Sequence, residues 1–369
     1  MLAEALFYLF TVIIGIQALY YLFVFSKFTF LNTTDTETKN IPVSVIICAK
    51  NEAENLKQYL PLIIQQDYPS FEIVLVDDNS SDDSLEIMES FTEKHKNIKI
   101  VKVKPIDKFW GNKKYPLTLG IKAASNNFLL FTDADCQPIS KQWIKSMASN
   151  FTSSKSLVLG YGGISGKKNS LLNKLIRYET LLTAVQYFSF ATFGMPYMGV
   201  GRNLAYRKDL FFEASGFMNH MHIKSGDDDL FVNQVATAHN TTICFNKESF
   251  TYSEGKNSFK NWVYQKRRHT ITSKYYKPKH KLLLGFFYLS QLIFWILAIV
   301  LIVLQVKLVW VLALIFLRLL IQQIILIKGA IKLNENSLVF WMVFLDFFLV
   351  FSQLIIFTLN LISKPKHWK

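Results

Sequence analysis

The sequence predicts an α/β fold, with an open, mostly parallel sheet covered by helices on both faces and transmembrane helices at both ends of the chain. Residues 41–281 alternate between short apolar runs rich in β-forming residues and helical stretches. This order favours a parallel sheet with helices on both faces. Long apolar runs flank the segment on both sides, and runs of about 20 apolar residues are typical of membrane-spanning helices.

The first element is an almost unbroken apolar run at residues 2–25. It is too long for the core of a signal peptide, and it lacks a basic leader and a small-residue cleavage site. We therefore expect residues 1–26 to form an N-terminal transmembrane anchor.

The central segment, residues 41–281, is expected to be the catalytic domain. Predicted strands lie at residues 43–48, 73–76, 98–103 and 128–132. Predicted helices between them include residues 52–65 and 84–95. Residues 171–190 form a longer amphipathic stretch, which fits either a surface helix or an interfacial helix under the membrane.

The last elements are three apolar runs, which assign residues 282–362 to a C-terminal transmembrane region of about three helices. The runs are residues 282–304, 308–327 and 338–362. Arg318 and Asp346 lie inside them and should face other helices or water, because a charge facing lipid is costly. Four spans would place the basic tail at 364–369 opposite the central domain, against the positive-inside tendency. One run could instead be re-entrant or interfacial.

Charge and cysteine content indicate the surroundings of the protein. The formal net charge is +14, and residues 256–281 carry nine lysines and arginines and no acidic residue, directly before an apolar run. This arrangement favours anionic membrane lipids as partners, and no nucleic acid is expected because no nucleic-acid-binding module is visible. Cys48, Cys136 and Cys244 have no paired spacing, which fits a reducing, cytosolic environment.

Acidic residues gather where predicted strands end. Asp133 and Asp135 follow the run at 128–132 and lie two residues apart. Carboxylate oxygens of this kind suit Mg²⁺ or Mn²⁺, which would neutralise a leaving diphosphate. The alternative is that these aspartates only cap a turn.

Two turns after predicted strands carry a family resemblance. Residues 49–56 read Ala-Lys-Asn-Glu-Ala-Glu-Asn-Leu, and residues 76–84 read Val-Asp-Asp-Asn-Ser-Ser-Asp-Asp-Ser. With the motifs below, residues 41–269 resemble the family 2 glycosyltransferases, whose nucleotide-sugar fold is called GT-A. The resemblance implies that Asn51, Glu52 and Asp77 bind the donor and that Asp78 contacts the nucleobase. Capping of the turn by Asp77 and Asp78 is compatible with this role.

Two further stretches extend the resemblance. Residues 111–120 are similar to the family's Gly-Gly-Lys…Ala-Leu-Asn-x-Gly segment, which implies that Lys113 contacts the nucleotide part of the donor. Pro116 and Thr118 depart from that pattern. Residues 199–207 are similar to a Gly-x-Asn-x-Ala-x-Arg stretch, which implies that Gly201 and Asn203 lie near the donor sugar.

The catalytic base is expected in the acidic turn at residues 225–230. This turn stands where the family has Glu-Asp-x-Asp-Leu, and aligning the final Asp-Leu makes Asp227 the base and Asp228 the alternative. A carboxylate near the acceptor hydroxyl can take its proton, and one base opposite one leaving group gives inversion. Adjacent aspartates also raise one another's pKa.

Residues 265–269 resemble the Gln-x-x-Arg-Trp motif of membrane-bound polysaccharide synthases, with His269 in place of the tryptophan. The resemblance implies that Gln265 and Arg268 bind the donor, with Arg268 paired to its diphosphate. Loss of the indole removes a stacking surface for an acceptor sugar, which puts processive synthesis in doubt.

The expected function is that of a multi-pass cell-membrane enzyme with a cytoplasmic catalytic domain. It would be a metal-dependent, inverting hexosyl- or N-acetylhexosaminyl-type transferase, moving a sugar from a nucleotide diphosphate donor, UDP by preference, to a lipid-linked or glycan acceptor. A processive synthase of an extracellular polysaccharide is the alternative. A nucleotidyltransferase is disfavoured because no glycine-rich phosphate-binding signature is present near the N-terminus, and intact acidic clusters argue against a non-catalytic protein.

Overall fold

The computed structural model describes residues 1–32, 39–104 and 113–363, which divide into two compact units. The helical unit comprises Met1–Asn32, Gly166–Phe193 and Asn257–Lys364. The sheet unit contains Thr33–Ser165 and Gly194–Lys256. Both units are discontinuous in sequence. The expected division of the chain stays a prediction: an anchor at residues 1–26, a catalytic domain at 41–281 and a membrane region at 282–362.

The sheet unit is built on a seven-stranded sheet with the strand order β3-β2-β1-β4-β8-β6-β9. Its strands are β1 (Val43–Ala49), β2 (Phe71–Asp77), β3 (Ile98–Lys102), β4 (Phe128–Asp133), β6 (Leu157–Leu159), β8 (Leu204–Arg207) and β9 (Thr241–Ile243). The first four strands in this order run parallel, and β8 runs antiparallel to both of its neighbours. The expected mostly parallel sheet is therefore confirmed.

A smaller sheet has the order β5-β10-β7. Its strands are β5 (Cys136–Pro138), β7 (Gly162–Ile164) and β10 (Thr251–Ser253). Strand β4 ends at Asp133, and β5 begins at Cys136 after a turn of two residues. This turn therefore connects the two sheets.

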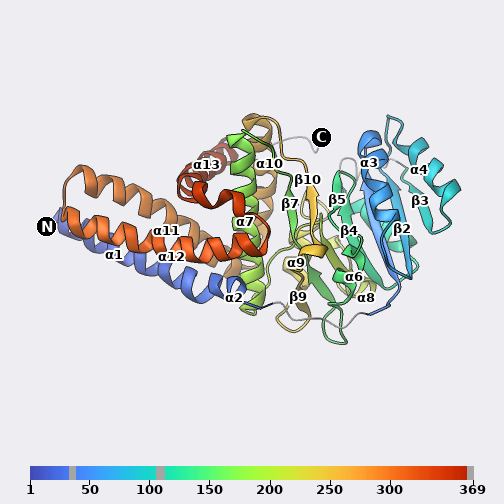
Figure 1. Cartoon of the computed structure of the whole chain (residues 1–369), viewed down its shortest axis with the longest axis horizontal. Coiled ribbons are helices and arrows are strands. Elements are labelled where there is room, and N and C mark those ends of the chain that lie inside the picture. Colours follow the sequence, from blue (N-terminus) through green and yellow to red (C-terminus); the bar gives the residue numbers. More distant parts are fainter. Residues whose placement is uncertain (33–38, 105–112, 364–369) are drawn as a thin grey trace. The chain divides into compact units, whose positions relative to one another are not determined.

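Helices cover both faces of the large sheet, as expected (Figure 1). On one face, α3 (Ala53–Ile64), α4 (Ser84–Lys94) and α6 (Trp143–Ala148) pack in one apolar core with alternate strand residues such as Val45 and Ile47. The other face carries α5 (Lys114–Ala123), α8 (Lys208–Glu213) and α9 (Asp229–Val235).

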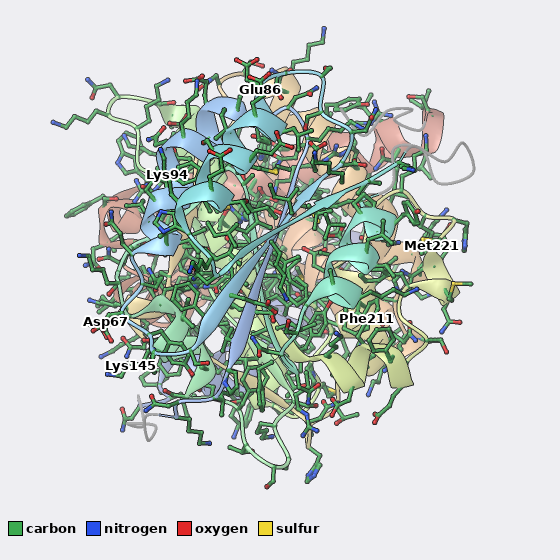
Figure 2. All side chains as sticks on the ribbon, turned by 90° about the vertical axis from the view of Figure 1, so that its right-hand side faces the viewer. Asp67, Glu86, Lys94, Lys145, Phe211 and Met221 are labelled. Carbon is green, nitrogen blue, oxygen red and sulfur yellow. The ribbon has the colours of Figure 1, made fainter. Side chains whose placement is uncertain are left out.

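Helix α5 lies unusually close to its strands. A Cβ added at Gly120 would come within 2.7 Å of Val76 and 3.1 Å of Ile46, so the missing side chain permits this approach. The packing matters for the site because α5 begins directly after Lys113. Charged side chains such as Glu86, Lys94 and Asp67 lie at the periphery of the same unit (Figure 2).

The helical unit contains four helical segments that are long and apolar enough to cross a membrane, among the residues described. They are Leu2–Thr29, Pro278–Val303, Leu308–Lys332 and Asn336–Ile362. The first comprises α1 (Leu2–Leu19), a π-helical stretch (Tyr20–Phe25) and α2 (Ser26–Thr29); the others are α11, α12, and a short 3₁₀ helix followed by α13 (Met342–Ile362). The four apolar runs expected from the sequence are confirmed as helices.

Arg318 and Asp346, the charged residues singled out within the apolar runs, face other helices, as expected. The Arg318 guanidinium of α12 lies 3.6 Å from the Asp346 carboxylate of α13, and both side chains are only 1% exposed. Arg318 Nε also donates to Gln17 of α1 at 2.6 Å. Asp346 accepts hydrogen bonds from three further donors, namely Tyr178, Gln291 and Trp295. One polar cluster thus joins all four apolar segments.

Tyr178 belongs to α7 (Leu171–Thr192), the amphipathic stretch with two possible interpretations. Helix α7 packs against α2, α12 and α13, and twelve of its 22 residues are buried. It is therefore an integral helix of the helical unit rather than a solvent-exposed surface helix.

Candidate active site

The acidic residues expected at strand ends meet at one edge of the large sheet. In the parallel register, Ala49 of β1 pairs with Asp77 of β2, and Cys48 pairs with Asp133 of β4. These three strands therefore end at nearly the same level. Turns that follow them bring residues far apart in sequence to one edge, where ligands of parallel sheets bind.

The turns after β1 and β2 are joined by hydrogen bonds. Asn51, which adopts a positive φ of 55°, accepts at Oδ1 from the Ser81 backbone N–H at 2.8 Å. Asp77 Oδ1 accepts from the Ser80 N–H at 3.2 Å. Glu52 donates its backbone N–H to Ser84 Oγ at 2.8 Å. These contacts fix the shape of the turns, which is the capping role foreseen for Asp77.

Asp78 differs from its neighbour Asp77 because its carboxylate reaches toward Lys50, with 3.5 Å between Asp78 Oδ2 and Lys50 Nζ. Burial raises the pKa of Asp78, while the Lys50 ammonium opposes that shift. The Asp78 side chain keeps 21% of its surface exposed. It is thus an accessible hydrogen-bond acceptor on this part of the edge.

The pair expected to bind a metal is close enough to do so. Ligand atoms of Asp133, Asp135 and Cys136 lie within 4.8 Å of one another. Burial, followed by the charges of Asp133 and Glu52, raises the pKa of Asp135. Carboxylates crowded in this way are stabilised by a cation, so the residues fit a hard divalent ion.

Cys136 does not fit the role of a third ligand. Burial, together with the neighbouring carboxylates, raises the pKa of its thiol well above the ordinary value. The thiol donates a hydrogen bond to Asp135 Oδ1 at 3.4 Å. Because the thiolate is the ligand form of cysteine, the two aspartates are the expected ligands and Cys136 orients one of them.

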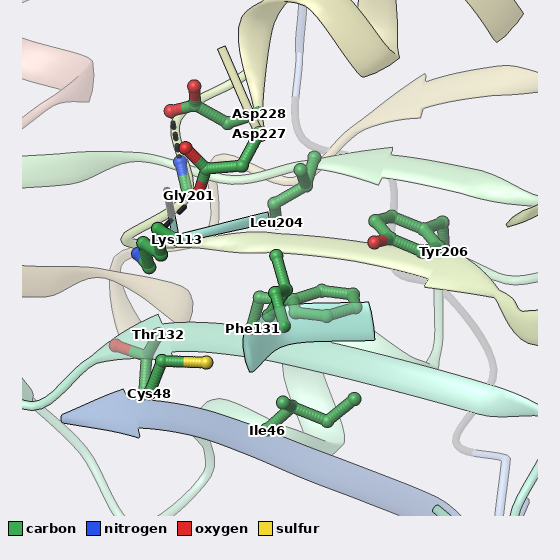
Figure 3. A pocket seen from close by; sticks show the side chains of 11 residues that line it. Ile46, Cys48, Lys113, Phe131, Thr132, Gly201, Leu204, Tyr206, Asp227 and Asp228 are labelled. Carbon is green, nitrogen blue, oxygen red and sulfur yellow. Dashed lines mark hydrogen bonds and ion pairs between the residues drawn. The ribbon is translucent and has the colours of Figure 1, made fainter. Parts of the chain in front are cut away.

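A pocket is lined by Lys113, by strand residues of the large sheet and by Asp227 and Asp228 of the acidic turn (Figure 3). Its lining comes from β1, β4, β8, α5 and the acidic turn: Ile46, Cys48, Lys113, Leu117, Phe131, Thr132, Gly201, Leu204, Tyr206, Asp227 and Asp228. Four predicted site residues, Lys113, Gly201, Asp227 and Asp228, are therefore brought together by the fold.

Lys113 lies between two acidic groups of the site. Its Nζ is 2.5 Å from Asp133 Oδ1 and 3.6 Å from Asp227 Oδ2. Although burial acts to lower it, the charges of Asp133 and Asp227 hold the pKa of Lys113 well above its usual value. The side chain is therefore a cation at neutral pH.

The two candidate bases use their carboxylates differently. Asp228 caps α9: its Oδ1 accepts from the Asp229 N–H, and its Oδ2 accepts from the Gly201 N–H, both at 2.7 Å. Burial and the charges of Asp227 and Asp229 raise the pKa of Asp228 to about 7. Asp227 instead faces Lys113 across the pocket (Figure 3).

Asn203, expected near the donor sugar, is completely buried. Its amide accepts from Trp143 Nε1 at 3.1 Å and donates to the carbonyls of Tyr161 and Ser249 at 2.9 and 2.7 Å. Both N–H groups of the amide are thus used internally. Any influence of Asn203 on a donor would act through the backbone that it fixes.

The sequence patterns did not predict a role for two basic residues near the site, Arg202 and Lys114. Arg202 donates to the carbonyls of Gly162 and Gly163 and to Ser253 Oγ, so it ties the loop before β8 to the smaller sheet. Lys114 is 1% exposed, and its Nζ donates to the carbonyls of His220 and Ile223 at 2.7 and 3.0 Å. Such internal ammonium contacts depend on the folded loop and could not be read from spacing.

The remaining predicted residues, Gln265 and Arg268, lie on α10 (Phe259–Thr272) of the helical unit. Within that unit, Lys266 pairs with Glu179 at 2.7 Å, and Arg267 Nε donates to Asn360 at 2.9 Å. The donor-binding roles of Gln265 and Arg268 stay predictions. Gly111 and Asn112 of the lysine motif, and the basic tail at 364–369, lie outside the described residues.

Comparison with protein families gives two matches. The model of glycosyl transferase family 2 matches residues 44–215, and that of glycosyl transferase family group 2 matches residues 133–359. The second match spans more than half of the chain.

Comparison with individual proteins gives similar results. Over 202 residues, 52% of this chain, the sequence is 31% identical to the glycosyltransferase AglE of Haloferax volcanii. It is 27% identical over 194 residues, 51% of the chain, to the poly(ribitol-phosphate) β-N-acetylglucosaminyltransferase TarS of Staphylococcus aureus. The matches span 60% and 31% of the lengths of those two relatives.

Among solved structures, the chain resembles a mannosyltransferase from Pyrobaculum calidifontis in complex with GDP-mannose and Mn²⁺. The TM-score is 0.59 at 17% sequence identity, covering 91% of this chain and 99% of the other. At that identity the likeness shows the fold, and the GT-A-like architecture expected from the sequence is confirmed.

Proposed function

Because the chain belongs to glycosyl transferase family 2, we propose that it moves a sugar from a nucleotide diphosphate donor to a lipid-linked or glycan acceptor at a membrane. The observation that carries the proposal is that Lys113 contacts both Asp133 and Asp227 at one pocket. These three residues come from three separate sequence motifs. A cation, a metal-binding carboxylate and a base within reach of one another suit displacement of a diphosphate.

We assign the base to Asp227. Its carboxylate faces the pocket, whereas both oxygens of Asp228 already accept backbone hydrogen bonds. Asp227 would take the proton of the acceptor hydroxyl while that oxygen bonds to the anomeric carbon. The bond from this carbon to the diphosphate breaks, and its electron pair leaves with the diphosphate. A single displacement inverts the anomeric centre.

Asp133 and Asp135 would hold Mg²⁺ or Mn²⁺. The ion supplies charge that stabilises the departing diphosphate. The Mn²⁺ bound in the structurally similar mannosyltransferase supports this assignment. The Lys113 ammonium, which lies near Asp133, would pair with the diphosphate of the donor.

The donor's nucleoside would lie over the turns after β1 and β2, with Asp78 accepting a hydrogen bond from the base. We favour UDP as the nucleotide and a hexosyl or N-acetylhexosaminyl group as the sugar. Similarity to TarS, named as an N-acetylglucosaminyltransferase, supports the sugar class.

We further propose a multi-pass membrane protein whose catalytic domain is cytoplasmic. Four apolar helical segments support insertion. Exposed basic residues that precede α11, including Lys260 and Lys274, support contact with anionic lipid on that side.

A donor-hydrolysis screen tests the proposed function. Full-length protein in detergent is incubated with individual UDP- and GDP-sugars in the presence of Mg²⁺, Mn²⁺ or excess chelator, and nucleotide release is measured. We expect release from one UDP-sugar, loss of release in chelator, and near-complete loss in Asp135→Asn. Full activity in chelator would contradict the metal assignment, and no release from any donor would contradict the function.

The length of the product separates single transfer from processive synthesis of a polysaccharide. We expect one sugar per acceptor, because His269 stands where the polysaccharide synthases carry tryptophan. Long radiolabelled chains would support the processive alternative.

A further inference from the structure

The Lys113 ammonium contacts a residue expected to bind the metal. Its Nζ lies 2.5 Å from Asp133 Oδ1, and Asp227 Oδ2 is next at 3.6 Å. The Lys113 side chain is only 19% exposed, so water screens these contacts weakly. In the structure, a side-chain cation thus takes up one oxygen of the Asp133–Asp135 pair.

An ammonium and a divalent ion cannot both rest on the same carboxylate oxygen without strong mutual repulsion. A metal bound through that Asp133 oxygen therefore requires Lys113 to move. Asp227, the other acidic group near Lys113, offers one new partner, and the diphosphate of a donor would offer another.

We propose that Lys113 is an internal counter-ion that competes with the metal at Asp133 until a nucleotide diphosphate draws the ammonium away. The proposal rests on the proposed function and adds a coupling between its two ligands. Lys113 pairs with both Asp133 and Asp227, and the donor's phosphate oxygens draw the ammonium away, which frees Asp133 for the metal. Metal and nucleotide consequently bind with positive cooperativity, in which each strengthens the other by the same factor.

Manganese binding without turnover tests the proposal. Free Mn²⁺ is measured by electron paramagnetic resonance on full-length protein in detergent, first alone and then with UDP. In Lys113→Gln we expect Mn²⁺ alone to bind about tenfold more tightly than in wild type, because its competitor is gone. The factor by which UDP strengthens Mn²⁺ binding should fall by a similar amount.

Lys50→Gln is the matched control, because it also removes an ammonium paired with an aspartate at this sheet edge, namely Asp78 at 3.5 Å. It should leave Mn²⁺ binding close to wild type, as should Lys113→Arg, which keeps the charge. Lys113→Met repeats the test if the glutamine variant does not fold. Unchanged or weaker Mn²⁺ binding in both neutral variants, or equal tightening in Lys50→Gln, would overturn the proposal.

Failure of the proposed function gives a different result. In that case UDP would not bind to wild-type protein at all. The Mn²⁺ affinities of wild type and Lys113→Gln, measured without UDP, would still test the role of Lys113. If UDP binds and donor turnover is present but Lys113→Gln does not tighten Mn²⁺, the function stands and the counter-ion role is wrong.

Discussion

Among single residues, Asp227 and Asp228 are neighbours in sequence with different surroundings. Asp228 begins α9 and fixes the Gly201 backbone, so its loss should disturb the shape of the pocket. Asp227 forms an ion pair with Lys113 and borders the pocket. The family alignment makes Asp227 the base and Asp228 the alternative, and the backbone hydrogen bonds of Asp228 support our proposal of Asp227.

Asp227→Asn should reduce turnover by about a hundredfold or more while donor binding stays nearly intact, because asparagine keeps the shape of the side chain but cannot take up the proton of the acceptor. Steady-state kinetics and UDP binding by calorimetry measure the two effects.

Asp228→Asn supplies the contrast within the same turn. It should lower thermal stability and weaken turnover less, since an amide can still accept one of the two backbone hydrogen bonds. Wild-type turnover in Asp227→Asn with a dead Asp228→Asn would move the base to Asp228.

Lys114 shows why part of the site could not be predicted. It directly follows Lys113, yet its side chain fastens the loop before the acidic turn from inside the fold. A lysine in a basic protein gives no sign of burial, because only the folded loop supplies the two carbonyls. Asn203 shows the opposite situation. Its motif predicted a contact with the donor, whereas its side-chain amide donates hydrogen bonds to the Tyr161 and Ser249 carbonyls inside the protein.

Lys114→Met should remove the ammonium donor of the Ile223 carbonyl and one of two donors of the His220 carbonyl, which also accepts from the Ile223 N–H at 3.1 Å. A buried carbonyl left without a partner costs about 1–3 kcal/mol. We expect faster hydrogen exchange in residues 218–226 and a lower kcat with a nearly unchanged affinity for UDP. A variant with wild-type exchange in this loop would show that Lys114 does not hold it.

The pH dependence of stability gives a second readout for Lys114. Burial lowers its pKa to about 8, against the opposing charges of the three aspartates. Between pH 8 and the ordinary lysine value of 10.5, the unfolded chain binds the proton that the folded protein has released. Wild type should therefore gain stability relative to Lys114→Met across that range, measured by thermal unfolding.

At the scale of elements, the strands and helices that the sequence predicted are those whose apolar pattern extends over four or more residues. The runs at 43–48 and 128–132 form β1 and β4 because mostly apolar, β-forming residues suit a strand buried on both faces. The strands β5, β6, β7, β9 and β10 are three residues each, too short for a period to appear. Their positions depend on pairings such as those of β8 and β10, which only the folded chain supplies.

The polar cluster of the helical unit gives a prediction for helix assembly. Arg318→Met and Asp346→Asn should each lower the unfolding temperature in detergent, since each leaves the other charge unpaired between helices. The double variant should be less destabilised than the sum of the single variants, by about 0.5–3 kcal/mol. Simple additivity would show that the two charges do not interact across α12 and α13.

At the scale of the whole molecule, the residues that line the candidate pocket belong to one compact unit and the apolar helices to the other. Sequence order suggested an anchor, a catalytic domain and a membrane region in succession. Helices α7 and α10 belong to the same compact unit as the apolar helices, where Tyr178 contacts Asp346 and Arg267 contacts Asn360. Such discontinuity follows from tertiary packing and leaves no mark in composition.

Removal of residues 2–29 should leave the protein in the membrane fraction, although the assembled helices should become less stable. The three remaining segments have 25 to 27 residues each. At about 1.5 Å per residue each is long enough for a hydrocarbon core of about 30 Å. Helix α1 packs against α11 and α12, and its Gln17 accepts from Arg318, so the deletion uncovers that charge. We therefore expect pelleting with membranes after carbonate extraction, together with a lower unfolding temperature in detergent. A folded product in the soluble fraction would show that α11, α12 and α13 do not insert into a membrane.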